Sequence, residues 1–211
     1  MISRRRIGRL MNRAGLWCKT KKKFKATTDS KHNKPLAPKL LGRQFAVSQP
    51  DRYYVGDITY VYTQEGGLYL AVVTDLFSRK VVGWSMDSRM KAQLVNDAFL
   101  MALWKRKPIK GLIWHTDRGS QYASDSHRAI IKAHHVIQSM SCKGNCWDNA
   151  VSESFFHTLK TEWVHPCQFR NRDEAKQAIF DYIEVFYNRE RIHSANDYLS
   201  PVDYEIQQKA V

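Results

Sequence analysis

The sequence predicts an α/β fold in which a mixed five-stranded sheet carries helices on its faces. Residues 53–86 hold three runs of β-branched and aromatic residues joined by short turns, the pattern of an antiparallel meander. From residue 92 onward, segments with helical apolar spacing alternate with short apolar runs, which indicates helix–strand crossovers. Of the 211 residues, 43% are apolar, so meander and crossovers can share one sheet and one core.

Each element of this sheet has its own local signal. The first strand, residues 53–63, ends at the turn sequence QEGG, and strands at 68–77 and 80–86 follow. A helix over 92–107 stops at Pro108, because proline supplies no N–H to a helix. We then expect a strand at 111–116, a helix near 126–134 and a strand at 135–140. Two helices follow, one from Asp148 or Asn149 through Trp163 and one with core spacing over residues 175–186.

The first 50 residues differ in charge from the rest of the chain. They hold 14 Lys and Arg and one acid, Asp29, whereas residues 51–211 hold 20 bases and 19 acids. Such a concentration is typical of a segment that binds the DNA phosphate backbone, although a solvated tail has the same composition. The candidate DNA contacts in it are Arg4, Arg5, Arg6, Lys19, Lys21, Lys22, Lys23 and Lys25.

The same segment divides into a helix and a linker. Ile7, Leu10, Met11 and Ala14 lie on one helical face, and Gly15 stands where a helix would end. One short helix cannot bury its own apolar face, so it must pack on the body, on a partner or in a larger domain. We therefore expect a helix at 1–17, a basic linker at 18–50, a main α/β domain at 51–165 and a helical extension at 166–211.

Composition argues against membrane and disulfide-rich classes. The apolar run LYLAVV is too short to span a bilayer, and no apolar stretch follows the N-terminal arginines as in a signal peptide. The four cysteines are scattered, so reduced thiols are expected. Cys142 and Cys146 lack partners at zinc-site spacing. A soluble, unsecreted protein is the resulting expectation.

Three carboxylates are the candidate chemical site. Asp57 interrupts a run of strand formers and is expected at the end of the first strand. Asp117 follows the strand at 111–116, and Glu153 falls in the first turns of a late helix. Taken alone, Asp57 could cap a bulge or pair with a lysine, and Asp117 is a common turn residue. Together they could converge on a pair of Mg²⁺ ions, with Mn²⁺ as a substitute, for phosphoryl displacement.

Glu153 lies on a polar helix face. At 100° per residue, Asn149, His157 and Lys160 fall within about 40° of it, opposite the apolar side chains. An ordinary solvated face explains such a stripe equally well. Asn149, His157 and Lys160 are nevertheless candidate DNA contacts beside the three carboxylates.

Flanking motifs carry a resemblance to a known family. Five motifs stand in order around the acids: DITYV, GLYLAVVTDLFSRKVVGWSM, HTDRGSQYAS, SMSCKGNCWDNAVSESFFHTLKTE and YNRERIHSANDYLSP. With 59 residues between Asp57 and Asp117 and 35 between Asp117 and Glu153, they closely resemble the second-frame protein of the insertion-sequence-three family of bacterial transposases.

The resemblance implies a ribonuclease H-like fold and a DDE-type DNA transposase. It implies that Asp57, Asp117 and Glu153 bind Mg²⁺, that element 3′ ends are cleaved, and that the freed hydroxyl attacks another phosphodiester. It further implies homo-oligomers on DNA, an upstream-frame partner with a helix-turn-helix and leucine zipper, and a cytoplasmic, nucleoid-associated location in bacteria. Lys160 would contact a phosphate or terminal base.

Some features depart from the family pattern. Tyr54 and Gly67 replace common tryptophans, and the region expected before the first helix is missing, so the chain is expected to be N-terminally shortened. A truncated, non-catalytic DNA-binding regulator therefore stands as the alternative. A host ribonuclease H-like nuclease fits the acids but not the flanking words.

Overall fold

The expected sheet is present and lies between two layers of helices. The computed structural model describes residues 3–17, 34–42, 47–141 and 150–209. Strands β1 (Tyr53–Thr63), β2 (Gly66–Asp75), β3 (Val81–Asp87), β4 (Ile113–Thr116) and β5 (Ile137–Met140) form one sheet in the order β3-β2-β1-β4-β5. β1, β2 and β3 pair antiparallel, whereas β4 and β5 run parallel to β1. This arrangement confirms the predicted mixed five-stranded sheet.

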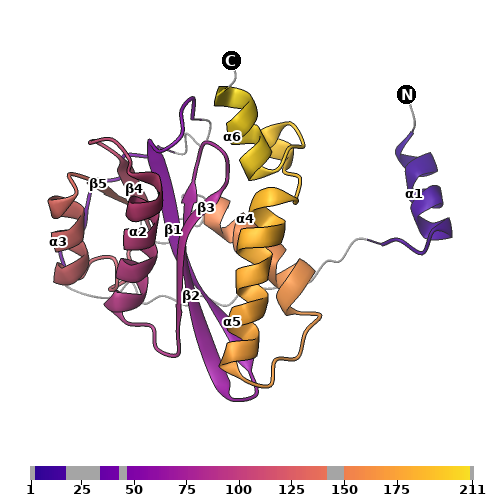
Figure 1. The fold of residues 1–211 in the computed structure, drawn as a ribbon, viewed down its shortest axis with the longest axis horizontal. Helices are drawn as coiled ribbons and strands as arrows, with labels where there is room; N and C mark the ends of the chain where they lie inside the picture. The colour runs from indigo at the N-terminus through magenta and orange to yellow at the C-terminus, as the bar shows by residue number, and fades with distance from the viewer. Residues whose placement is uncertain (1–2, 18–33, 43–46, 142–149, 210–211) are drawn as a thin grey trace.

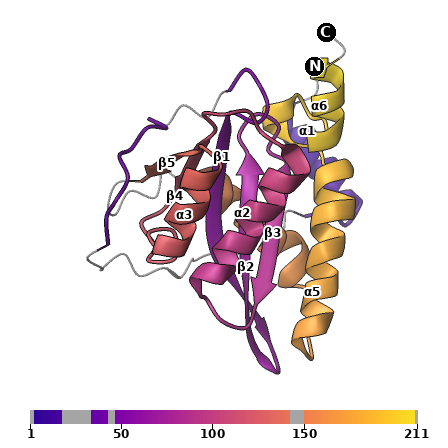
Figure 2. The same cartoon turned by 60° about the vertical axis from the view of Figure 1, so that its left-hand side comes forward.

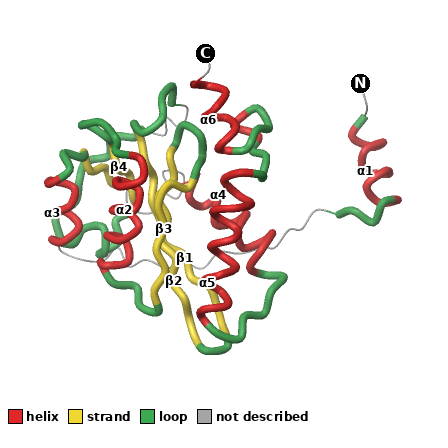
Figure 3. The backbone as a smooth tube through the Cα atoms, in the orientation of Figure 1, coloured by secondary structure: helices red, strands yellow, loops and turns green. Residues whose placement is uncertain are grey.

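Helices α2 (Ala92–Arg106) and α3 (Asp125–Ala133) cover one face of the sheet. Figure 1 shows the sheet nearly edge-on, with these two helices on its left and α4 (Ala150–Leu159) and α5 (Arg172–Phe180) on its right. Figure 2, turned by 60°, places α2 and α3 in front of the sheet. Helical and extended segments alternate after β3, as the coloured tube in Figure 3 shows. The architecture thus has three layers.

The two faces of β1 enter different cores because successive side chains alternate across a strand. Tyr54 and Ile58 pack with α2 and α3, whereas Val61 packs with Phe155 and Phe156 of α4. The face that carries Val61 also carries Asp57, at the same side-chain parity. The sheet therefore aims Asp57 toward α4.

Packing accounts for Tyr54 and Gly67, the two positions at which the family that the sequence resembles commonly has tryptophan. Tyr54 is fully buried and donates its hydroxyl to Asp51 Oδ1 at 2.5 Å. At Gly67 a Cβ would lie 2.1 Å from the ring of Tyr60, which covers the glycine from the neighbouring strand. A tryptophan at 67 would require Tyr60 to move, so both departures concern packing.

Residues 34–42, within the expected linker, lie against the body. Leu41 is buried with Val55 and Leu76. The N–H of Leu40 donates to Ser139 Oγ at 2.9 Å, and the N–H of Met140 donates to the carbonyl of Pro38 at 3.3 Å. This segment consequently crosses the end of β5 and is held there by hydrogen bonds.

Helix α1 (Arg4–Arg13) forms where the periodicity predicted it. Ser3 caps its start by accepting from the N–H of Arg6, and Gly15 follows its end with φ 65°. None of its residues is buried, and it stands apart from the sheet in Figure 1. Its apolar face, which includes Ile7 and Leu10, is therefore exposed in the described structure.

The C-terminal helices pack beside α4 and reach back to α2. After α5 the chain continues as a π-helix (Asp181–Tyr187), a 3-10 turn (Ser194–Asn196) and α6 (Pro201–Lys209). The carboxylate of Glu205 in α6 accepts hydrogen bonds from both terminal nitrogens of Arg106, at 2.9 and 3.0 Å. Arg106 Nε also donates to Asp51 at 2.7 Å. A buried ion network thus ties α6 to the end of α2.

Asp75 belongs both to this network and to the turn after β2, where its carbonyl accepts the N–H of Arg79 at 2.9 Å. Its carboxylate is fully buried and accepts the N–H groups of Phe77 and Asp51, both at 3.0 Å. Arg106 lies 3.6 Å away. Burial raises the pKa of Asp75 to about 7, against the opposing backbone hydrogen bonds. Ser78 donates to Glu205 at 2.8 Å.

Candidate active site where strand β4 ends

Asp57 and Asp117 occupy adjacent positions on neighbouring strands. Gly56 of β1 pairs with Thr116, the last residue of β4, and the residue that follows each of them in the chain is an aspartate. Since the two strands are parallel, both chains leave this pair in the same direction. Asp57 is only the fifth residue of β1, so the expectation that it ends the strand was wrong. It lies where β4 ends and β1 continues.

Backbone N–H groups orient both aspartates. Asp57 Oδ1 accepts the N–H of Ile58 at 2.7 Å, and Asp117 Oδ1 accepts the N–H of Gly119 at 2.8 Å. The second bond forms within the turn after β4, where an aspartate accepts from the residue two positions on. Each carboxylate thus has one oxygen fixed by the backbone, and both side chains are half-buried.

Helix α4 brings Glu153 to the same side of the sheet. Phe155, Phe156 and Leu159 are buried against β1 and β2, which fixes the rotation of the helix. Glu153 and Lys160 are half-buried, and His157 is exposed. The predicted division into apolar and polar sides is therefore present along α4. Asp148 and Asn149, the expected start of this helix, lie outside the described residues.

A π-helical turn (Lys160–Val164) follows α4 directly. The N–H of His165 bonds to the carbonyl of Lys160 at 2.8 Å, five residues back. Such turns shift the following side chains around the axis and occur often at functional sites. Sequence spacing alone gave no sign of this turn.

The three carboxylates and Lys160 interact electrostatically. Burial, followed by the Asp117 carboxylate, raises the pKa of Asp57 well above its usual range, and Glu153 raises it further. The Ile58 N–H and the Lys160 ammonium oppose this rise. Burial also raises the pKa of Glu153 and lowers the pKa of Lys160, while Asp57 acts in the opposite direction on Lys160. The fold therefore holds the carboxylates of Asp57, Asp117 and Glu153 close enough that burial and mutual repulsion disfavour the charged form of Asp57.

Tyr122 is a neighbour that sequence reasoning missed. Its ring is buried between α3 and the sheet, and it contacts Trp114 edge-to-face. Burial, then Asp57 and Asp117, raises the pKa of its phenol well above the usual range. Tyrosine in a helix-flanking turn is ordinarily core material, so no local pattern could have placed it beside the carboxylates.

The predicted DNA contacts are spread over two regions. Lys160 lies at the carboxylates and His157 one turn earlier on α4. Arg4, Arg5 and Arg6 are exposed in the first turns of α1. The expected contacts in the basic linker lie outside the described residues: Lys19, Lys21, Lys22, Lys23 and Lys25. Close to the carboxylate turn, Lys34 Nζ donates to the carbonyl of Ser120 at 3.2 Å.

His115 and Arg191 have structural partners. His115 is buried and shares a hydrogen bond between Nδ1 and Ser139 Oγ at 2.8 Å. Arg191 binds both oxygens of Glu162 at 2.8 Å. This ion pair joins the C-terminal segment to the π-helical turn after α4.

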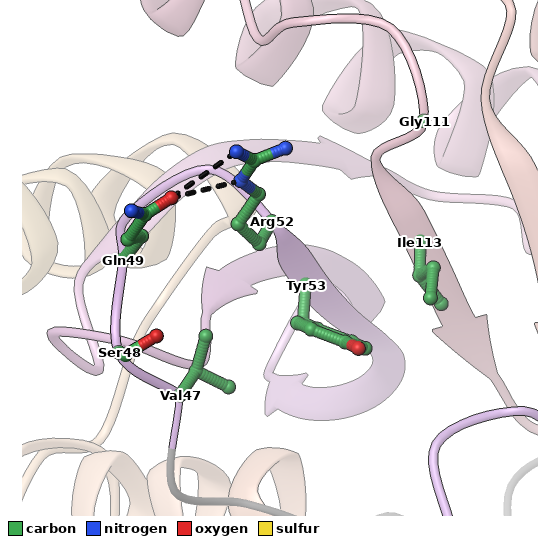
Figure 4. Close-up of a pocket in the computed structure, with 7 residues that line it drawn as sticks. All are labelled: Val47, Ser48, Gln49, Arg52, Tyr53, Gly111 and Ile113. Carbon is green, nitrogen blue, oxygen red and sulfur yellow. Dashed lines mark hydrogen bonds between the residues drawn. The ribbon is translucent and has the colours of Figure 1, made fainter.

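A separate pocket lies at the other end of the β1–β4 pair. It has a volume of about 420 Å³ and is lined by Arg52 and Tyr53 at the start of β1, by Gly111 and Ile113 of the β4 entry, and by residues 47–49. Figure 4 shows Arg52 binding the Gln49 side chain there, through nitrogens at 3.1 and 3.2 Å. No carboxylate lines it, and the three acids lie elsewhere.

The donor chemistry at the three acids suits a hard divalent cation. Carboxylate oxygens are the ligands that Mg²⁺ prefers, and a cation would relieve the repulsion that raises the pKa of Asp57. Among the described residues, no three Asp, Glu, His or Cys side chains already stand together as a finished ligand set.

Comparison with known proteins gives a consistent result. Two models named integrase core domain match residues 47–146 and 153–208. The transposase InsF for insertion sequence IS3A of Escherichia coli (strain K12) is 49% identical over 195 residues, 92% of this chain and 68% of that protein. The transposase for insertion sequence element IS904 of Lactococcus lactis subsp. lactis (strain IL1403) is 46% identical over 205 residues, 97% of this chain and 81% of that protein.

Solved integrases share the fold at low sequence identity. The HTLV-2 integrase catalytic core domain in complex with magnesium superposes with a TM-score of 0.54 at 18% identity, covering 74% of this chain and 96% of that one. A chain of the simian T-cell lymphotropic virus intasome gives 0.62 at 16% identity, covering 84% of this chain and 60% of that one. These likenesses confirm the ribonuclease H-like fold.

No described helix is long and apolar enough to cross a membrane.

Identity approaching one half, over nearly all of this chain and more than two thirds of each transposase, extends well beyond the carboxylates. The chain belongs to the insertion-sequence-three family of transposases, enzymes of the DDE polynucleotidyl transferase class.

Proposed function

We propose that this chain cleaves the 3′ ends of an insertion element and joins the freed 3′-hydroxyl to another phosphodiester, in a reaction that depends on Mg²⁺. The observation that carries the proposal is the pairing of Gly56 with Thr116, which sets Asp57 beside Asp117. Glu153, from the helix on the same side, acts on Asp57 through space. Both observations support the proposal that the three carboxylates converge on a pair of Mg²⁺ ions, as two-metal phosphoryl transfer requires.

In this proposal Asp57, Asp117 and Glu153 hold the metal. When bound, Mg²⁺, or Mn²⁺ in its place, would supply Lewis-acid activation and stabilise charge on the oxygens of an in-line displacement. The backbone N–H bonds to Asp57 and Asp117 limit how far these two side chains can turn. Glu153 has no such bond among the described contacts and sits on a helix, so it has the greater freedom to adjust.

Lys160 is proposed to bind the phosphate next to the scissile bond. Its ammonium is half-buried and close enough to Asp57 to lower that residue's pKa. A cation so placed can contact a phosphodiester while the carboxylates hold the metal. His157, exposed one turn earlier, and Asn149 are proposed as secondary contacts.

Binding to DNA is proposed to begin with the basic N-terminal segment. Phosphate contacts by Lys and Arg supply sequence-independent affinity that falls as salt rises. Homo-oligomers on DNA and an upstream-frame protein with a helix-turn-helix and a leucine zipper complete the proposed assembly. End recognition would then come from the partner, and chemistry from this chain.

Strand transfer on element-end DNA with Mg²⁺ tests the proposal, with and without the upstream-frame protein. Asp57→Asn and Glu153→Gln should lose activity by orders of magnitude while keeping fold and DNA affinity. Asp125→Asn is the matched control, because this carboxylate is 94% exposed and starts α3, which packs on the face of the sheet opposite α4. Activity in the two site variants equal to wild type would disprove the triad. DNA binding without cleavage under every condition would favour the regulator.

A further inference from the structure

A groove lies beside the outer half of β1, next to the three carboxylates. It has a volume of about 440 Å³ and is here called the β1-edge groove. Residues 60–62 and 64 form one wall, and residues 160, 164, 165 and 167–169 form the other. At the far end the N–H of Gln64 donates to the carbonyl of Phe169 at 3.0 Å, which joins the two walls.

The groove exists because β1 is longer than β4. β4 pairs with residues 53–56 only, so from Asp57 onward no described strand covers this edge of β1. Alternate residues of a strand direct their N–H groups to the same edge. The N–H of Ile58 donates to the Asp57 carboxylate, and the N–H of Gln64 donates to the carbonyl of Phe169, both on this edge. The N–H groups of Tyr60 and Tyr62, which alternate with them along the chain, therefore face the same edge.

The chemistry of the groove suits a nucleic acid strand. Its lining contains Lys160 and His165 and no carboxylate. The nearby acid Glu162 is paired with Arg191 through two bonds of 2.8 Å. Tyr62 is 70% exposed and offers a ring on which a base can stack. Sites for single strands combine these two features, a basic groove and an aromatic platform.

We propose that the β1-edge groove holds unpaired nucleotides that adjoin the phosphodiester at the carboxylates, with a phosphate near Lys160 and a base against Tyr62. The inference rests on the proposed function, because Lys160 belongs to both the groove and the candidate active site. It adds a substrate class: DNA whose strands are separated next to the cleavage point.

Two other occupants fit the groove less well. A duplex keeps its bases paired and stacked, so it presents no free base face to Tyr62. A peptide, or a second copy of this chain, could pair with the open edge of β1 by strand addition. Strand addition uses only backbone hydrogen bonds, so it would not explain why Lys160 lines the groove. A DNA strand that leaves the carboxylates would reach Lys160 first.

Binding measurements without metal separate the groove from catalysis. The probes are a fluorescein-labelled duplex with a short unpaired extension and the same duplex with blunt ends, titrated by anisotropy in EDTA. The wild-type chain should prefer the extended duplex. Tyr62→Ala should reduce that preference on the order of tenfold, because a stacked base is lost. Tyr62→Phe should retain it, and Tyr198→Ala should leave it unchanged, since this tyrosine is equally exposed, at 69%, but lies on the C-terminal tail.

Cys167 supplies a second readout within the unaltered protein. It is an exposed thiol in the groove wall, so bound nucleotides should slow its alkylation by iodoacetamide. Peptide mapping distinguishes it from the other three cysteines. The extended duplex should protect Cys167 more strongly than the blunt duplex does.

Three results would overturn the proposal: an unchanged preference in Tyr62→Ala, equal alkylation of Cys167 with both probes, or loss of self-association in DNA-free Tyr62→Ala. The last would assign the groove to a second copy of the chain. Failure of the proposed function would look different, because Asp57→Asn would then cut DNA as well as wild type whatever the groove binds.

Discussion

Replacing Gly56 with alanine should destabilise the fold and disturb the carboxylate site together. A Cβ at this position would lie 2.0 Å from one ring carbon of Trp114 and 2.7 and 2.9 Å from two others. Carbon atoms ordinarily approach to about 3.5–4.0 Å. The indole or the strand must therefore shift by roughly 1.5 Å, in the pair of strands that carries Asp57 and Asp117.

Trp114 has little freedom to make room. It is 1% exposed, its ring stacks on Phe99 with centroids 4.7 Å apart, and its Nε1 donates to His127 at 2.9 Å. Overpacking a core costs about 1–3 kcal/mol, and losing the indole hydrogen bond adds about 1 kcal/mol. We expect a total of about 2–4 kcal/mol. For a chain of this size that lowers Tm by roughly 4–16 °C.

Urea unfolding followed by circular dichroism measures this cost. Gly8→Ala is the matched control, since a Cβ there meets no atom within 4 Å. Combining Gly56→Ala with Trp114→Leu should cost less than the sum of the single changes, by about 1–2 kcal/mol, because the smaller side chain leaves space. A strictly additive pair, or Gly56→Ala as stable as wild type, would refute the steric reasoning. Strand transfer by Gly56→Ala should also fall more than its loss of folded protein explains.

Two further predictions concern charge. Asp75 has a folded pKa of about 7, above the unfolded value of about 3.9, so the folded chain holds its proton more tightly and stability falls as pH rises through that window. Asp75→Asn should flatten the decline in Tm between about pH 4 and pH 7, and an unchanged slope would contradict this assignment. Without metal, Asp57→Asn should be more stable than wild type, because burial and Asp117 disfavour its charge. Mg²⁺ at about a hundred times its Kd should add about 2.7 kcal/mol to wild type, seen as a rise in Tm, and much less to the variant; an equal rise in both would argue against metal at Asp57.

Periodicity predicted the elements well because their apolar spacing reflects burial directly. The strand over residues 53–63 was placed correctly, and the helix expected at 92–107 runs from Ala92 to Arg106. The second strand, expected at 68–77, spans Gly66–Asp75 instead. There the turn residues join the ladder, since Thr63 Oγ1 donates to the carbonyl of Gly66 at 2.5 Å and the two residues pair. Local sequence does not reveal where pairing takes over from a turn.

Long-range partners set what the sequence could not predict. Asp75 ends β2 and precedes a turn, and its bond to the N–H of Phe77 is the local kind that sequence can suggest. Its other partners, Asp51 and Arg106, lie 24 and 31 positions away in the chain, and no local pattern indicates them. Likewise, the relative lengths of β1 and β4 decide that Asp57 sits in mid-strand, and only the register of the sheet contains that information.

The unequal lengths of β1 and β4 also connect stability with function in this fold. Were β4 as long as β1, it would cover the edge at Asp57 and satisfy the outer backbone groups, but no groove would adjoin the carboxylates. By ending at Thr116, β4 leaves Asp117 at a turn and Asp57 at an open edge. Burial and mutual repulsion then make the charged state of Asp57 unfavourable until a cation or the Lys160 ammonium offsets it. A longer β4 would thus stabilise the sheet but close the site. This explains why the acids lie where the hydrogen bonding between β1 and β4 stops.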